Sequence, residues 1–248
     1  HRGEVFIRQA DGTWKQFAEG LHEPLGLLPD GKGALLVMQR PELTRLVDVD
    51  GDGKADRYQT VCDSFGMTGN YHEFAFGPAR GPDGALYISL NLASAGAGVF
   101  KEIRGDWSDI GKATREQLTA GKTGAAGRMY GRVPYRGCIL RIADNGRGPA
   151  ELYATGFRSP DGIGFDAKGH LLVNDNQGDW RGSSPLQVVT KGSFNGHPAS
   201  LVWTPGWNKG DPLEVPVPEL EKLRTQPGGI FIQGDLSNSP TQPAVFPA

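Results

Sequence analysis

Short apolar runs alternate with turns of Asp and Gly along most of the chain. The pattern is clearest in residues 27–37, 74–88 and 163–173. Each segment begins with an apolar run, turns around Asp and Gly, and ends in Leu-Leu-Val or Leu-Tyr-Ile. Short apolar runs bounded by such turns are typical of β-hairpins. The pattern therefore predicts an all-β fold.

A longer repeat joins these hairpins into units. Residues 3–26 and 137–162 follow the same order: a strand, an Asp/Gly turn, a second strand, a Gly corner and Pro-x-Gly. Self-similarity of strands and turns indicates a radial or stacked array. Four short antiparallel strands per unit are typical of a β-propeller blade. We therefore expect a β-propeller of four-stranded antiparallel blades.

The expected strands follow from this unit, from the innermost strand outward. They are 24–29, 34–38, 44–48 and 57–62 in the second blade, 73–77, 85–89, 138–143 and 151–154 in the third, and 161–166, 170–174 and 186–190 in the fourth, with a last strand near 200–203. The first unit shows only its outer strands. The last unit shows only 229–233 and a trace near Val245.

This organisation predicts a single propeller domain over residues 1–248, with about four blades' worth of strands. We expect it to be part of a larger ring; the alternative is that the two ends pair and close a small ring. Residues 92–136 interrupt the third blade as a long Gly- and Ala-rich inserted loop, with a short helical stretch near 114–120. An insertion of this length usually serves as a functional lid or a mobile loop.

Composition excludes several classes of protein. The 37 Gly and 18 Pro residues rule out a long helical bundle, because both residue types break helix interiors. A net charge of −2 gives no reason to expect nucleic acid or an anionic membrane as a partner. No apolar run approaches the roughly 20 residues of a membrane span.

The chain has two cysteines, Cys62 and Cys138, which could pair in an oxidising compartment. Two buried free thiols are the favoured interpretation.

Antiparallel strand order decides which loops share a face of the propeller. Loops that enter an innermost strand and loops that leave the next strand lie together, and hairpin turns lie on the opposite face. The first face collects His, Arg, Trp and carboxylate side chains that turns do not require, and we place the functional site there. Its residues are His22, Glu23, Gln39, Arg40, Tyr71, His72, Glu73, Asn91, Arg158, Ser159, Asp161, Asp175, Asn176, Gln177, Asp179 and Trp180.

Within this face, Arg158 leads the fourth blade's inner strand, and residues 175–180 follow the next strand. A guanidinium beside carboxylates and amides suits an acidic or carbonyl-bearing ligand; the alternative is an ion pair from Arg158 to Asp161 or Asp175 that pins the loops. His72, beside Glu73, suits a general base, although a lone His is more often structural. Trp180 could stack on a flat ligand or cap the core.

The sharpest local motif is acidic. Asp48, Asp50, Asp52 and Asp56 occupy alternating positions around glycines, as in the first half of an EF-hand-like calcium loop. These carboxylates and the Lys54 carbonyl would suit Ca²⁺, and the alternative is a solvated acidic turn. Because the motif lies in a hairpin turn, we expect it on the face away from the site, in a structural role.

Residues 150–198 resemble the soluble quinoprotein glucose/sorbosone dehydrogenases. The resemblance rests on Gly-Phe-Arg-Ser-Pro-Asp-Gly at 156–162, an acidic/Gln-Gly loop at 175–179, and Lys-Gly-Ser-Phe-Asn-Gly-His-Pro at 191–198. Residues 72–88 are similar to the blade that bears that family's catalytic His. The whole chain also resembles the propeller part of planctomycete-type dehydrogenase-like proteins, which carry a further haem-binding module that is absent here.

This resemblance implies pyrroloquinoline quinone (PQQ) and Ca²⁺ as cofactors, oxidation of a sugar, and a periplasmic or secreted location. It implies a c-type cytochrome as the electron acceptor. His72 and Arg158 would be catalytic. The cofactor-binding residues would be Arg158, Asp161, Asp175, Asn176, Gln177, Gly178, Trp180 and Arg40, with backbone oxygens of Gln177 and Gly178 near the cofactor's Ca²⁺.

Two other functions remain open from the sequence. Pro-Asp-Gly-Ile-x-Phe-Asp and Leu-x-Val-x-Asp-Asn also resemble metal-dependent lactonase-type propellers, in which Glu23, Asp175 and Asn176 would hold a central Ca²⁺. A calcium-stabilised binding module without chemistry is the other alternative.

Overall fold

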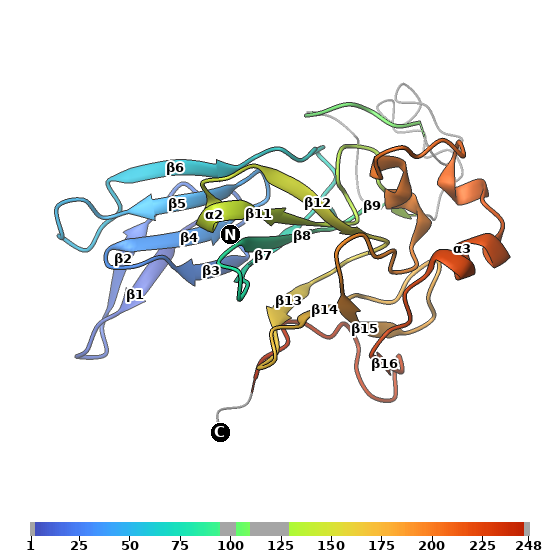
Figure 1. Ribbon diagram of the computed structural model, residues 1–248. Coiled ribbons are helices and arrows are strands. Elements are labelled where there is room, and N and C mark those ends of the chain that lie inside the picture. The colour runs from blue at the N-terminus through green and yellow to red at the C-terminus, as the bar shows by residue number, and fades with distance from the viewer. Residues whose placement is uncertain (1–2, 95–102, 110–128, 246–248) are drawn as a thin grey trace.

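The computed structural model describes residues 3–94, 103–109 and 129–245, which form a partial β-propeller of antiparallel sheets (Figure 1). Its second blade is the sheet β3-β4-β5-β6 and its third is β7-β8-β11-β12, counted outward from the innermost strand. The strands are β3 (Gly26–Pro29), β4 (Ala34–Met38), β5 (Leu43–Val47), β6 (Arg57–Cys62), β7 (Ala75–Arg80), β8 (Leu86–Leu90), β11 (Cys138–Ile142) and β12 (Ala150–Thr155). These agree with the sequence prediction to within three residues at every strand end.

The fourth blade contains one correction. Its strands are β13 (Gly162–Phe165), β14 (Leu171–Asn174), β15 (Ser184–Val189) and β16 (Gly229–Phe231). The prediction of an outer strand near 200–203 was wrong, because these residues belong to the 3₁₀ helix η2 (Pro198–Trp203). Proline at its start favours a helical turn, and the His197 side chain caps it by accepting the Ala199 amide. The outer strand comes instead from the segment predicted for the last unit.

The remaining elements flank these sheets. The first unit is a two-stranded sheet, as predicted, and a second small sheet closes the base of the insertion. The first of these sheets pairs β1 (Val5–Arg8) with β2 (Trp14–Ala18), and the second pairs β9 (Ala93–Ser94) with β10 (Met129–Tyr130). The remaining helical elements are α2 (Ala143–Gly146), η3 (Pro212–Glu214) and α3 (Val217–Leu223). The helical stretch predicted near 114–120 lies outside the described residues. No helix in the described ranges is both long and apolar enough to cross a membrane.

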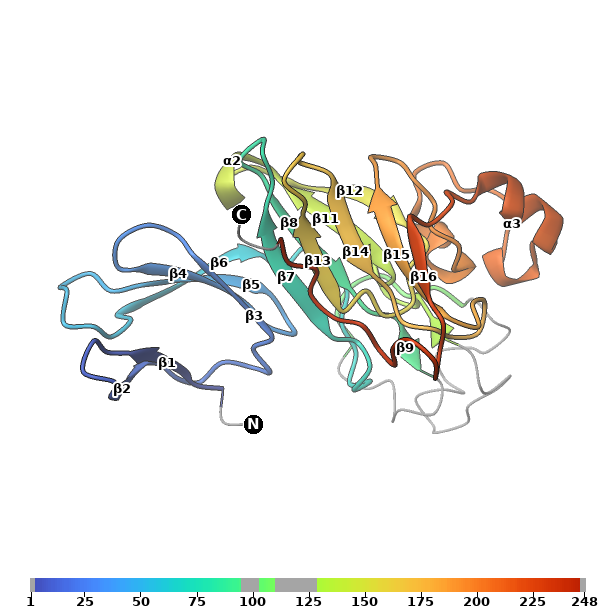
Figure 2. The ribbon, with the colours of Figure 1, turned by 90° about the horizontal axis from the view of Figure 1, so that it is seen from below.

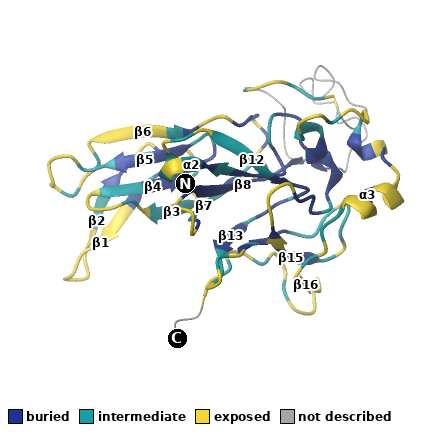
Figure 3. Ribbon diagram, viewed as in Figure 1, coloured by how far each residue is buried: buried dark blue, intermediate teal, exposed yellow. Residues whose placement is uncertain are grey.

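Successive blades pack face to face, and their cores lie between them (Figure 2). Leu36 and Met38 of the second blade pack with Ile88 and Leu140 of the third. A second cluster joins the third blade to the fourth, and a third joins the β1–β2 sheet to the second blade. Figure 3 shows the buried strands at the centre and the exposed hairpins at the periphery. Both cysteines are buried and free, as favoured from the sequence.

The innermost strands approach one another so closely that only glycine fits at the contacts. A Cβ atom at Gly26 of β3 would lie 1.6 Å from the carbonyl oxygen of Gly77 in β7. A Cβ atom at Gly162 of β13 would lie 2.2 Å from the carbonyl oxygen of Thr241. Residues 241–243 thus lie beside β13, although they form no strand there. Gln242 Nε2 donates to the Ile163 carbonyl at 2.5 Å.

A half-buried carboxylate joins two blades on the face that carries the hairpin turns. Asp30, after β3, accepts hydrogen bonds from Arg45 Nε at 2.6 Å, Arg80 Nη2 at 2.9 Å and Asn145 Nδ2 at 2.9 Å. Burial alone would raise the pKa of Asp30, but these donors outweigh it and lower the pKa below its ordinary 3.8. Asp30 therefore stays ionised near neutral pH and binds the second blade to the third.

Candidate functional site

The candidate site forms where loops from the third and fourth blades meet, as the strand order predicts. The Asp175 carboxylate accepts the backbone amides of Arg158 at 3.0 Å and Ser159 at 2.7 Å. The Asn176 amide donates to the Ser159 carbonyl at 3.1 Å. These bonds bring the loop that enters β13 against the loop that leaves β14. Asp175 is 1% exposed, so it holds the loops in place rather than facing a ligand.

Arg158 is half-buried and lies over the backbone of Gly178. A Cβ atom at Gly178 would come within 2.9 Å of Arg158 Nε, so glycine leaves room for the guanidinium. Arg158 Nη1 donates to Ser159 Oγ at 3.3 Å. Nε is buried and has no hydrogen-bond partner within the described part of the chain. A buried guanidinium N–H of this kind suits an anionic or carbonyl acceptor.

Asp161 occupies the centre of the site. Asn91 Nδ2, from the end of β8, donates to Asp161 Oδ1 at 3.0 Å, and Asn176 Nδ2 donates to Oδ2. Burial raises the pKa of Asp161 to about 6, against the Asn91 hydrogen bond and the Arg158 charge, which lower it. Burial likewise raises the pKa of Asp175 to about 6, against the amides of Arg158 and Ser159.

The sequence analysis placed Asn91 on this face but did not identify it as a site residue. A polar residue directly after a buried strand was the signal that could have identified it.

His72 contributes an imidazole to the site that is neutral at pH 7. Burial lowers the pKa of His72 below its ordinary 6.5, and the Arg158 charge lowers it further. Its ring packs edge-on against Tyr71, with centroids 4.7 Å apart. Nδ1 is buried and finds no hydrogen-bond partner among residues 3–94, 103–109 and 129–245. A neutral ring nitrogen without a partner can accept a proton.

Asn70 fixes the loop that carries His72. Its Oδ1 accepts the backbone amides of His72 at 3.1 Å and Ser94 at 3.2 Å. Its Nδ2 donates to the Ser94 carbonyl at 2.7 Å. Ser94 belongs to β9 at the base of the insertion, and Met129 of β10 donates its amide to the Asp179 carboxylate at 2.7 Å. The base of the insertion therefore contacts both loops of the site.

Arg40 and Glu73 have structural partners. Arg40 is 7% exposed, pairs with Glu23 at 3.3 Å, and donates to the carbonyls of Thr68 and Asn70. The Glu73 carboxylate accepts the Thr68 amide at 2.6 Å, and burial raises its pKa. Arg40 thus holds loops together, and the cofactor contact expected from the sequence stays a prediction.

The remaining predicted residues line the fourth blade's loop. Trp180 packs on the apolar clusters around Ala199 and Leu201, which favours its role as a cap of the core. Gln177 donates its amide to Ser184 Oγ at 3.1 Å. The Gly178 carbonyl already accepts the Arg181 amide at 2.9 Å, which leaves it one lone pair for any further partner.

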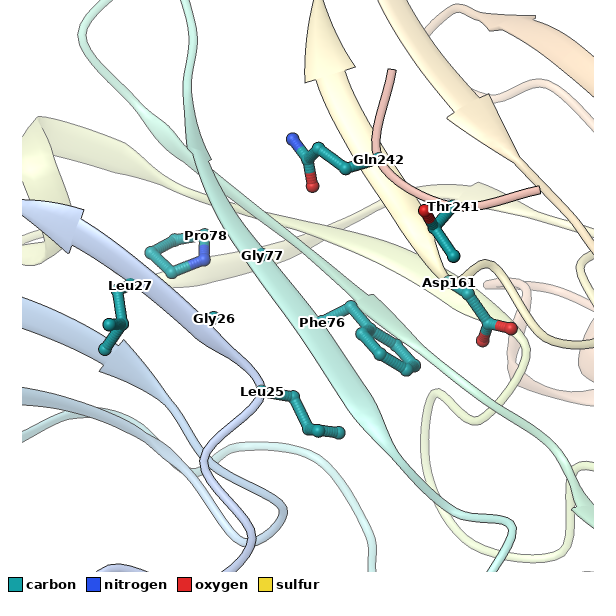
Figure 4. A pocket seen from close by; sticks show the side chains of 9 residues that line it. All are labelled: Leu25, Gly26, Leu27, Phe76, Gly77, Pro78, Asp161, Thr241 and Gln242. Atoms are coloured by element: carbon teal, nitrogen blue, oxygen red, sulfur yellow. The ribbon is translucent and has the colours of Figure 1, made fainter. Parts of the chain in front are cut away.

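A cavity of about 410 Å³ runs between the innermost strands next to this site (Figure 4). It is lined by Leu25–Leu27 of the second blade, Phe76–Pro78 of the third, Asp161, and Thr241 with Gln242. Figure 4 shows Asp161 at the start of β13, beside this space. Asp161 therefore connects the site on the loop face to the axial cavity.

The acidic hairpin lies between β5 and β6, far from the site (Figure 1). Carboxylate oxygens of Asp48, Asp50 and Asp56 all lie within 4.8 Å of one another. Asp52 is not part of this group; its carboxylate, like the other three, accepts a backbone amide, that of Lys54 at 2.8 Å, and Lys15 donates to the Asp52 carbonyl. The structure therefore brings three of the predicted calcium ligands together; no contact in it tests the Lys54 carbonyl, which stays a prediction.

Comparison with known protein families places the chain in a family. A sequence model described as a domain of unknown function, DUF7133, matches residues 9–133. The chain belongs to this family. The DUF7133 match includes His72 and Asn91 and ends before Arg158 and Asp161. A search of curated proteins finds no match.

Solved structures show the fold of this DUF7133 chain. An oxidoreductase from Thermus thermophilus, titled a glucose dehydrogenase, is 20% identical with a TM-score of 0.55, over 94% of this chain and 65% of its own. A second glucose dehydrogenase is 14% identical with a TM-score of 0.50, over 92% and 66%. A third is 12% identical with a TM-score of 0.47, over 78% and 56%.

The first two likenesses establish a dehydrogenase-like β-propeller fold. The chain spans between 56% and 66% of the lengths of these three structures.

Proposed function

We propose that this propeller is a sugar oxidoreductase that uses PQQ. One observation carries the proposal: a neutral imidazole and a carboxylate both lie close enough to one guanidinium to feel its charge, and the carboxylate lines the axial cavity. Among the described residues, one N–H of that guanidinium is buried without a hydrogen-bond partner. These groups are His72, Arg158 and Asp161. A polar ligand that carries hydroxyl and carboxylate groups would use all of them.

The residues present fit a carboxylated quinone. Arg158 would hold one of its carboxylates, and the glycine at 178 leaves space for the guanidinium to lie flat. Asn176 and Gln177 lie on the same loop and would supply further polar contacts. When bound, the quinone would accept the two electrons released from the sugar carbon.

His72 would take the proton of the sugar hydroxyl. Its lowered pKa keeps the ring neutral at pH 7, so Nδ1 can accept a proton. Arg158 would keep the ring neutral before the reaction, because its positive charge disfavours an imidazolium nearby. Asp161 would orient the substrate through the hydroxyl groups that its carboxylate accepts.

Calcium, location and electron acceptor belong to the same proposal. We infer that Ca²⁺ binds the hairpin at 48–56 in a structural role, and that backbone oxygens of Gln177 and Gly178 contribute to a cofactor ion. A periplasmic or secreted location and a c-type cytochrome acceptor follow from the resemblance of residues 150–198 to quinoprotein dehydrogenases.

The contacts of the expected ligands favour the dehydrogenase over the lactonase alternative. Glu23 pairs with Arg40, and the Asp175 carboxylate accepts backbone amides, so both carry other partners. A binding module without chemistry remains as the alternative that the experiment must separate.

Dye reduction tests the proposal. The chain is supplied with PQQ and Ca²⁺ and assayed across a panel of aldoses, beside His72→Ala and the control His170→Ala. His170 is exposed on the opposite face and pairs with Asp166, so its loss should leave the rate unchanged. His72→Ala should lower kcat at least about a hundredfold. Equal rates for both variants, or quinone binding without turnover of any sugar, would refute the oxidoreductase.

Quinone titration separates binding from chemistry. Arg158→Ala should weaken quinone affinity by at least about tenfold, the loss expected for a charge-assisted hydrogen bond. Arg158→Lys should recover little, because the planar guanidinium is lost. Arg147→Ala is the control, since Arg147 is exposed on the hairpin face. Equal affinities for the wild type and Arg158→Ala would remove Arg158 from the cofactor site.

A further inference from the structure

Another cavity opens beside β12, the outermost strand of the third blade. Its volume is about 470 Å³. The end of β12, the loop after β15, the segment that contains and follows η2, and the end of α3 build its walls. It shares no lining residue with the axial cavity, and Figure 2 shows α3 beyond β16, away from β13. A ligand bound in this outer cavity would therefore lie apart from the site described above.

Backbone hydrogen bonds hold the walls of the outer cavity in place. The Gly192 amide donates to the Tyr153 carbonyl at 2.7 Å, which binds the loop after β15 to β12. The Thr225 amide donates to the Phe194 carbonyl at 2.8 Å, which binds the residues after α3 to the same loop. Because these segments are joined before any ligand binds, a ligand would not have to order them.

Trp207 contributes an indole ring to the outer cavity. Its Nε1 donates to the Gly210 carbonyl at 2.8 Å, which fixes the orientation of the ring. The ring packs on the buried cluster that contains Phe194 and Leu201, and both of these residues also line the cavity. An indole held in this way offers a flat apolar surface, which suits the C–H groups of a sugar ring.

Hydroxyl side chains form much of the remaining lining. They are Thr155, Thr190, Ser193, Thr204 and Thr225. Ser193 Oγ accepts a hydrogen bond from Asn195 Nδ2 at 3.1 Å, so the hydroxyl keeps its own proton to donate. Hydroxyl groups donate and accept hydrogen bonds, as the hydroxyl groups of a saccharide do. The lining therefore matches a ligand that carries both kinds of group.

Lysine side chains supply the charge of the outer cavity. Among the described residues that line it, Lys191 and Lys209 are the charged ones. Lys191 donates to Glu151 at 2.8 Å, but Arg141 also donates to that carboxylate, at 2.9 Å. Lys209 lies 3.7 Å from Glu219, which is too far for a good hydrogen bond. Both ammonium groups therefore keep donors for an anionic ligand.

We propose that the outer cavity binds an anionic saccharide, with Trp207 against a sugar ring and Lys191 and Lys209 beside a carboxylate or sulfate group. A small inorganic anion would leave the indole unused, and an apolar ligand would leave the hydroxyl groups unused. The proposal goes beyond the proposed function, since this site requires neither a quinone nor the oxidation of a sugar. It would hold an acidic glycan without reacting with it.

Calorimetric titration with trigalacturonate tests the site, at low ionic strength and without PQQ. Lys209→Gln should weaken binding about threefold, and Trp207→Ala about fivefold. The matched controls are Lys222→Gln, on the exposed surface of α3, and Trp14→Ala, whose side chain is 66% exposed on β2. Both controls should bind as the wild type does. Absence of binding to the wild type, or equal affinities for all variants, would overturn the proposal.

Two further titrations establish the class of ligand and its place. Maltotriose is a neutral trimer and should bind about tenfold more weakly than trigalacturonate, since it gains nothing from two ammonium groups. A sulfated disaccharide that binds more tightly than trigalacturonate would identify sulfate as the preferred anion. Equal binding of maltotriose and trigalacturonate would overturn the anionic class.

Arg158→Ala places the ligand. It should bind trigalacturonate as the wild type does, and a loss of binding would move the ligand to the axial site and overturn the proposal. If Trp207→Ala fails to fold, the exposed Lys191→Gln/Lys209→Gln pair carries the test, with an expected loss of about tenfold. An unchanged affinity in that double variant would overturn the proposal.

Discussion

Removal of Asp30 should show how strongly the second and third blades depend on one half-buried carboxylate. In Asp30→Ala, Arg45 and Arg80 lose their shared partner while their side chains stay only 17% and 33% exposed. Breaking a fully buried ion pair costs about 3–5 kcal/mol, because it leaves an uncompensated charge. Partial exposure of both guanidinium groups allows water to reach them. We therefore expect a loss of about 2–3 kcal/mol in the free energy of unfolding.

Urea denaturation at pH 7 measures this loss, and Asp83→Ala is the matched control. Asp83 occupies the equivalent turn of the third blade and pairs with Arg141, but its side chain is 39% exposed. The control should cost about 1 kcal/mol or less. The slope of the unfolding free energy with urea should be unchanged in both variants, which shows that the same surface is exposed.

The difference in the free energy of unfolding between the wild type and Asp30→Ala should depend on pH with a definite sign. The pKa of Asp30 is lowered in the folded chain, so its contribution is complete above the unfolded value and is lost as the pH falls through the folded value. The gap between the wild type and Asp30→Ala should therefore be full at pH 7 and shrink below about pH 4. A cost for Asp30→Ala no greater than that for Asp83→Ala would refute the reasoning.

Three further outcomes are expected. Gly26→Ala should lower the free energy of unfolding by more than about 2 kcal/mol in chemical denaturation, because its Cβ would overlap the Gly77 carbonyl; an effect below about 1 kcal/mol would contradict the close approach of β3 and β7. Asp50→Asn should lower the melting temperature in Ca²⁺ but not in chelator, and a wild-type melting temperature that ignores chelator would remove the hairpin ion. Dye reduction should fall as the pH drops through the lowered pKa of His72, since protonation consumes the base; a rate that does not fall on acidification down to the pH at which the chain unfolds would exclude His72 as that base.

The repeat allowed most strands to be predicted, because each hairpin carries its own apolar runs and turn residues. The outer strand of the fourth blade lacked such a signal. β16 pairs over only Gly229–Phe231, and two 3₁₀ helices and α3 separate it from β15. The apolar run at 201–203 resembled a strand but follows a proline and a capping histidine, and those local signals favoured η2.

The site was predictable as far as strand order determines it. That order placed Arg158 against the loop at 175–180 and put Asn91 on the same face. It could not show how individual side chains would be used. Arg40 holds two loops together because it contacts both Glu23 and the Thr68 carbonyl. No spacing in the sequence predicts that contact.

The attachment of the insertion has a consequence for how such a protein can diversify. Asn70 links Ser94 to the amide of His72, and Asp179 receives the amide of Met129, so both ends of the inserted segment are anchored at the rim of the site. The blade cores lie elsewhere, between stacked sheets. Substitutions at these two anchors can therefore reposition the loops of His72 and Asp179 while the packing between the blades is left unchanged.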